Sequence, residues 1–235
     1  MAEEYLTDDE QLEVVKRWTA ENGIWLVGGI ALGVALLWGY RYYESYKNEQ
    51  ALKAAAQFSA MTDALDKNDQ NAARHIADGL IKDYSNTPYA DQAQFALARL
   101  SIDAGEPAKA VAPLTQVMSH SSDNELQHIA RLRLARVLTD QGKADDAIAT
   151  LGTVPSGAFA GRYHEVRGDA FFAKKSFKEA LLEYKEAQVG SDERGADRSV
   201  LSLKIAELAA LVPATMVPAT MVPATNPDLS NKAKP

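Results

Sequence analysis

The chain contains no cysteine. This absence excludes disulfide bonds, thiolate nucleophiles and cysteine-ligated zinc. It is compatible with an oxidising compartment such as the periplasm, although it does not establish one. Positive charge is also scarce, because 25 Lys and Arg residues face 32 Asp and Glu residues and the net charge is −7. A nucleic-acid-binding protein needs a basic face to neutralise phosphates, so this composition argues against one.

Motifs for catalysis and for cofactor binding are missing as well. The sequence has no phosphate-binding loop, dinucleotide fingerprint, H-E-x-x-H motif or nucleophile elbow. The four histidines have no metal-ligand spacing; they are His75, His120, His128 and His164. The sequence therefore predicts no enzyme, no cofactor and no metal site.

Proline is rare in most of the chain and concentrated at its end. Of nine prolines, those after residue 211 are Pro213, Pro218, Pro223, Pro227 and Pro235. They fall in a repeat of Val-Pro-Ala-Thr-Met, and such regular prolines prevent a helix. Residues 212–235 are therefore predicted to be a disordered, proline-rich tail that is not needed for folding.

Charge is absent from Asn22 to Tyr40. As a helix this segment is about 28 Å long, which matches the hydrocarbon core of a bilayer. Trp25 and Trp38 lie near its two ends, where aromatic rings favour the membrane interface. The preceding residues are acidic and no cleavage site follows, so a signal peptide fits less well, as does a buried core helix. Residues 23–43 are predicted to span a membrane, after a short acidic segment, 1–22.

Two properties of this helix stay open at the sequence level. Gly29 and Gly33 form a G-x-x-x-G pattern, which either packs against another membrane helix or reflects the general frequency of glycine in spans. Lys16 and Arg17 precede the uncharged segment and Arg41 follows it. Because long domains cross membranes largely regardless of flanking charge, the charges do not decide the topology.

Between the span and the tail, the pattern of apolar residues is helical throughout. The predicted helices are 45–66, 70–84, 88–104, 107–119, 123–141, 143–153, 158–174, 176–188 and 195–211. Glycines such as Gly105 and Gly142 end helices just before the next one begins. This region, 44–211, is predicted to be one all-α domain.

The helices contain an internal repeat. Gly105, Ala110, Leu114 and Val117 return as Gly142, Ala147, Leu151 and Val154, and a third copy contains Ala180. Periods of about 33–37 residues are typical of tetratricopeptide-type repeats, although an ordinary helical bundle with coincidental spacing is the alternative. The small residues Ala110, Ala147 and Ala180 are predicted to lie where paired helices cross.

Repeats of this kind stack into an α-solenoid that binds peptides on its inner face. Arg131, Arg133 and Arg136 either line such a face or pair on the helix surface with Glu125 and Asp140. The spacing of these residues favours the surface pairs.

Several short segments occur in the order found in one known family. They are Lys16-Arg17-Trp18, Glu21-Asn22-Gly23, Gly39-Tyr40-Arg41-Tyr42, Leu80-Ile81-Lys82-Asp83-Tyr84 and Thr87-Pro88-Tyr89-Ala90. In these segments, residues 5–211 resemble the YfgM-like ancillary subunits of the SecYEG translocon. The resemblance implies a single-pass protein of the inner membrane with a cytoplasmic N-terminus and a periplasmic repeat domain. It also implies association with SecYEG and with a PpiD-type periplasmic chaperone.

Two functions are compatible with the sequence. The first is a non-enzymatic adaptor at the translocon that links translocated polypeptides to periplasmic chaperones. The alternative is a membrane-anchored scaffold for another envelope assembly or division complex.

Overall fold

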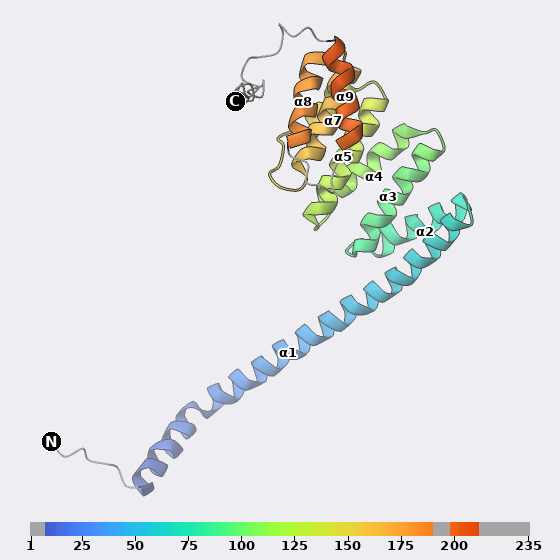
Figure 1. Cartoon of the computed structure of the whole chain (residues 1–235). Helices are drawn as coiled ribbons and strands as arrows, with labels where there is room; N and C mark the ends of the chain where they lie inside the picture. Colours follow the sequence, from blue (N-terminus) through green and yellow to red (C-terminus); the bar gives the residue numbers. More distant parts are fainter. Residues whose placement is uncertain (1–7, 190–197, 212–235) are drawn as a thin grey trace, which may run out of the picture. The chain divides into compact units, whose positions relative to one another are not determined.

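The computed structural model describes residues 8–189 and 198–211, and within these ranges every regular element is a helix (Figure 1). The elements are α1 (Asp8–Asp66), α2 (Gln70–Asp83), α3 (Pro88–Asp103), α4 (Pro107–His120), α5 (Asn124–Asp140), α6 (Ala144–Leu151), α7 (Ala160–Ala173), α8 (Phe177–Val189) and α9 (Arg198–Leu211). The predicted all-α fold is confirmed. The predicted tail, 212–235, and the first residues of the predicted 195–211 helix lie outside the described residues.

Helix α1 is continuous from Asp8 to Asp66. It runs through residues 22 and 44 without a break, so the domain boundaries predicted there stay predictions. The chain divides into two compact units after Gln57. In the first unit, large apolar side chains such as Ile24 and Trp25 are about 80% exposed. By length and composition, α1 contains one segment apolar enough to cross a membrane, and none of that segment is buried within the protein.

In the second unit, the helices form pairs joined by one recurring turn. The first helix of each pair is the end of α1, α3, α5 or α7, and the second is α2, α4, α6 or α8. Each turn contains a residue with positive φ: Asn68 (58°), Gly105 (73°), Gly142 (75°) and Lys175 (62°). The next residue donates its backbone N–H to the carbonyl five residues back, at 2.8–2.9 Å in all four turns. These bonds are those of a Schellman motif, which ends one helix and directs the chain into the next.

Packing repeats with the turns. Each second helix has an alanine with no exposed surface at the same repeat position: Ala73, Ala110, Ala147 and Ala180. The largest core cluster runs through α3, α4, α5, α6 and α7, and a smaller one joins α8 to α9 through Tyr184, Leu201 and Leu208. Helix α9 therefore covers the end of the last pair with its own apolar side chains (Figure 1).

Candidate functional site

The first helices of the pairs expose corresponding side chains on one face of the repeat domain. Arg136, Thr139 and Asp140 of α5 are three and four residues apart, so they lie on one side of the helix. Asp169, Phe172 and Ala173 hold the same repeat positions on α7. All six line one cavity of about 490 Å³, together with Tyr184, Lys204 and Glu207 from α8 and α9. The repeat thus builds a surface hollow from corresponding positions of successive helices.

A second cavity, of about 300 Å³, adjoins the first. It is lined by Ile129, Leu132, Arg133, Arg136, Arg162 and Glu165, which all belong to α5 and α7. Arg136 lines both cavities, so they are neighbours at its side chain. We call the two together the α5–α7–α9 groove and the smaller one its arginine cavity.

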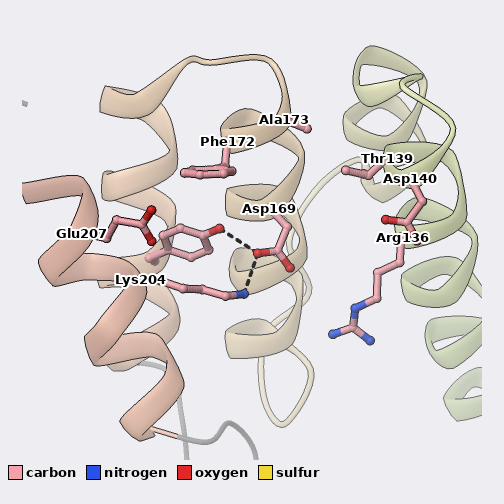
Figure 2. Close-up of a pocket in the computed structure, with 9 residues that line it drawn as sticks. Arg136, Thr139, Asp140, Asp169, Phe172, Ala173, Lys204 and Glu207 are labelled. Carbon is pink, nitrogen blue, oxygen red and sulfur yellow. Dashed lines mark hydrogen bonds and ion pairs between the residues drawn. The ribbon is translucent and has the colours of Figure 1, made fainter. Parts of the chain in front are cut away.

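The end of the groove near α9 is held by a closed polar network (Figure 2). The Tyr184 hydroxyl and the Lys204 ammonium each donate a 2.7 Å hydrogen bond to Oδ1 of Asp169. Lys204 also lies 5.1 Å from the centre of the Tyr184 ring and 3.7 Å from Glu165. Burial, and then the hydrogen bond to the Asp169 carboxylate, raise the pKa of Tyr184 well above its usual value. The network joins α7, α8 and α9 and keeps Tyr184 neutral.

The arginine cavity has a different character, because its cations have no carboxylate partner among the described residues. In the ranges that the structure describes, Arg133, Arg136 and Arg162 form no ion pair and no hydrogen bond through their side chains. The predicted pairs with Glu125 and Asp140 are therefore absent there. Arg133 instead lies over the ring of Phe95, with 4.6 Å between the guanidinium carbon and the ring centre. Burial and the nearby charge of Arg136 lower the pKa of Arg133.

Of the arginines considered from the sequence, Arg133 and Arg136 line the groove. The predicted membrane-packing glycines and helix-crossing alanines lie elsewhere, in three places. Gly29 and Gly33 are exposed on α1, and a Cβ added to either would meet no atom within 4 Å. Ala110 and Ala147 belong to the large core cluster and Ala180 to the smaller one. All three alanines are fully buried, and their role as helix-crossing positions stays a prediction.

Sequence reasoning missed Asp169, Phe172 and Lys204 as groove residues. For α7, the repeat register itself contained the signal. Arg99, Arg136 and Asp169 each follow the small residue of a first helix, namely Ala98, Ala135 and Gly168. Aligning the first helices on these small residues, as was done for the alanines of the second helices, would have placed these three side chains on a common face. Lys204 lies on α9, outside the repeats, so that register could not find it.

Within the described ranges, no group of His, Asp or Glu side chains is arranged to hold a metal ion. The class of protein is defined by three features: stacked helix pairs, one recurring turn geometry and a groove lined by the first helices. This protein is a tetratricopeptide-repeat-like α-solenoid with a candidate membrane anchor in α1.

Comparisons with known proteins agree with this class and narrow it. The model of a family described as a tetratricopeptide repeat-like domain matches residues 16–210. The chain is 33% identical over 205 residues to a protein of Escherichia coli (strain K12) named "Ancillary SecYEG translocon subunit", covering 87% of this chain and 98% of that relative.

Two further relatives carry the same name. The protein of Haemophilus influenzae is 28% identical over 182 residues, which cover 74% of this chain and 89% of the relative. The protein of Neisseria gonorrhoeae is 28% identical over 205 residues, which cover 87% and 98%. The chain belongs to the family of ancillary SecYEG translocon subunits, as the resemblance of its short segments implied.

Proposed function

We propose that this protein is a non-enzymatic, membrane-anchored adaptor of the SecYEG translocon. The observation that carries the proposal is the extent of the similarity, which covers 98% of the Escherichia coli relative and so includes both the apolar helix and the repeats. An adaptor needs an anchor near the translocon and a surface for a second polypeptide. Helix α1 and the α5–α7–α9 groove are suited to these two tasks.

The proposed location is the inner membrane, spanned once by residues 23–43. Residues 1–22 would face the cytoplasm and the repeat domain, 44–211, the periplasm. Support comes from the unburied apolar segment of α1 and from the name of the relatives. Protease added to spheroplasts should degrade the repeat domain before the cells are lysed. Full protection of the domain until lysis would contradict this topology.

The proposed partners are SecYEG within the membrane and a PpiD-type chaperone with translocated polypeptides in the periplasm. For the membrane contact, Gly29 and Gly33 lie one turn apart on an exposed part of α1, and a Cβ there would meet nothing within 4 Å. Two small residues at this spacing let another helix approach closely.

Affinity purification of the tagged full-length protein in a mild detergent tests the proposal. SecYEG subunits should co-purify with the wild type, and a Gly29→Ile/Gly33→Ile variant should retain less of them because the added side chains separate the helices. Gly28→Ile, on a neighbouring face of α1, is the matched control and should retain SecYEG. Recovery of a different envelope assembly without SecYEG would contradict the proposal and favour the scaffold alternative.

A further inference from the structure

We infer that the α5–α7–α9 groove binds an extended peptide segment that places a carboxylate in the arginine cavity and an apolar side chain against Phe172. This inference rests on the proposed adaptor function, since it names the chemistry of the polypeptide that the repeat domain receives. It assigns a ligand class to side chains that are otherwise unexplained.

The first argument is the lack of partners for three guanidinium groups. Arg133, Arg136 and Arg162 line one cavity, yet in the described part of the chain none of them pairs with a carboxylate. Elsewhere in that part, Arg99 pairs with Asp103 at 3.5 Å and Arg167 pairs with Glu183 at 3.5 Å. Arg74 and Arg131 also pair with no carboxylate there, so what distinguishes the three groups is that they line one cavity together.

The second argument is that the arginine cavity itself has more positive than negative side chains, three arginines against Glu165. Glu165 is the carboxylate that lines the cavity, and its Oε1 already lies 3.7 Å from Lys204. Arg133 is fixed over Phe95 rather than over an acid. Positive charge is thus concentrated at one place on a chain whose net charge is −7. A guanidinium binds a carboxylate through two parallel hydrogen bonds, so a carboxylate is the ligand group that this cavity fits.

The third argument is the apolar surface next to the cavity. Phe172 is 39% exposed although it lies in the groove, and Tyr184 lines the same cavity. In Figure 2 the Arg136 side chain extends from α5 and Phe172 extends from α7, and both residues line this cavity. Because Arg136 lines both cavities, one peptide can place neighbouring side chains in the two. The polar groups between them, Asp169 and Lys204, are paired with each other and so do not compete for the ligand.

Fluorescence anisotropy with the full-length protein in detergent tests the inference. The probe is a fluorescein-labelled peptide of alternating glutamate and leucine, and the comparison peptide has glutamine in place of glutamate. Loss of one charged hydrogen-bonded contact weakens binding by about tenfold or more. The glutamate peptide should therefore bind the wild type at least about tenfold more tightly than the glutamine peptide. Equal binding of the two peptides would overturn the inference.

Variants of single residues then test which side chains contact the peptide. Arg136→Gln and Arg162→Gln should each weaken binding of the glutamate peptide by about tenfold, and Arg136→Lys by less, because it keeps the charge without the planar fork. Arg99→Gln is the matched control, since Arg99 holds the same repeat position as Arg136 but lines a separate cavity. Phe172→Ser should weaken binding of both peptides equally. Unchanged binding by Arg136→Gln, or an equal loss in Arg99→Gln, would overturn the assignment.

An anionic lipid headgroup could also offer oxygen atoms to arginines, so vesicles containing phosphatidylglycerol form the second arm. Vesicle binding that depends on Arg136, combined with no binding of the glutamate peptide, would overturn the peptide inference. The peptide assay contains no translocon. If the glutamate peptide did not bind, the groove assignment would be wrong and the adaptor proposal would stand. If SecYEG were not recovered by affinity purification, the adaptor proposal would be wrong and the peptide-binding result would stand.

Discussion

The two middle helix pairs and the last pair share one backbone frame but distribute side-chain size differently. In α3–α4 and α5–α6, an alanine of the first helix corresponds to a leucine of the second: Ala98 with Leu114, and Ala135 with Leu151. In α7–α8 the same positions hold Gly168 and Tyr184, and all six residues are buried. A Cβ on Gly168 would lie 2.6 Å from two ring carbons of Tyr184. The tyrosine ring therefore occupies the space that an alanine side chain takes in the middle pairs.

The exchange of leucine for tyrosine gives the last pair a hydroxyl group at a position where the middle pairs have an apolar side chain. The Tyr184 hydroxyl bonds to Asp169, which also binds Lys204 of α9. Middle pairs share one core cluster with the next repeat, and a hydrogen bond of 2.7 Å between His128 and Tyr163 also joins α5 to α7. Helix α8 joins α9 in a separate cluster. The comparison indicates that the last pair is specialised to end the solenoid on α9, and that this end forms one wall of the groove.

The largest loss of stability is expected from a substitution in a middle helix pair. Ala147→Leu adds a larger side chain at a position with no exposed surface, and overpacking of this kind costs about 1–3 kcal/mol. Ala149→Leu, two residues away and exposed, should change stability little. Urea denaturation followed by circular dichroism measures both. Equal midpoints for the two variants would contradict the repeat register.

A glycine-to-alanine change in the last pair should have a smaller effect on stability, and it should destabilise the protein rather than stabilise it. Replacing a helical glycine by alanine normally stabilises a protein by roughly 0.5–1 kcal/mol. Gly168→Ala should instead destabilise it by about 1–2 kcal/mol, because the new methyl group meets the Tyr184 ring. In a Tyr184→Leu background, which restores the alanine–leucine pair of the middle repeats, the same change should be neutral or stabilising. A double-mutant cycle from urea midpoints measures this coupling.

Helix positions were predictable from sequence because the repeat domain obeys local rules. Periodic apolar residues and the turns at Gly105 and Gly142 place α2 to α8 within a few residues of the observed bounds, whereas the predicted helix 45–66 is the end of the longer α1. Asn68 and Lys175 adopt the same positive φ without being glycine, so residue type did not mark these two turns. The register did mark them, since each lies five residues before a fully buried alanine, Ala73 or Ala180.

The groove was less predictable than the fold, for a physical reason. Arg133 and Arg136 were recognised as a cluster, but helix spacing favoured surface pairs with Glu125 and Asp140. In the structure these arginines lie in a cavity between α5 and α7, where Arg162 joins them. Contacts between helices far apart in sequence decide the outcome, and one-dimensional spacing does not contain them.

The polar connection to α9 should make a measurable but smaller contribution. Asp169→Asn removes the charge that binds Lys204, while its amide oxygen can still accept from Tyr184. A partly buried, charged hydrogen bond is worth about 1–2 kcal/mol, so the urea midpoint should fall accordingly. Asp145→Asn is the control, because Asp145 pairs with Lys174 at an exposed site where ion pairs contribute little. If both variants lost the same stability, Asp169 would not be a special link to α9.

The smallest expected effect compares the turns of the two kinds of pair. Lys175 adopts a φ of 62°, whereas Gly142 adopts 75° at the corresponding turn. A side chain in this left-handed region costs about 1 kcal/mol, and glycine avoids the cost but loses more entropy on folding. Lys175→Gly should therefore stabilise the protein by roughly 0.5 kcal/mol, and Gly142→Lys should destabilise it by about as much. Opposite shifts of the two urea midpoints are the required result. If Lys175→Gly instead lowered stability, the lysine side chain would make a contact that compensates for its backbone conformation, and the last turn would differ from the middle ones in more than residue type.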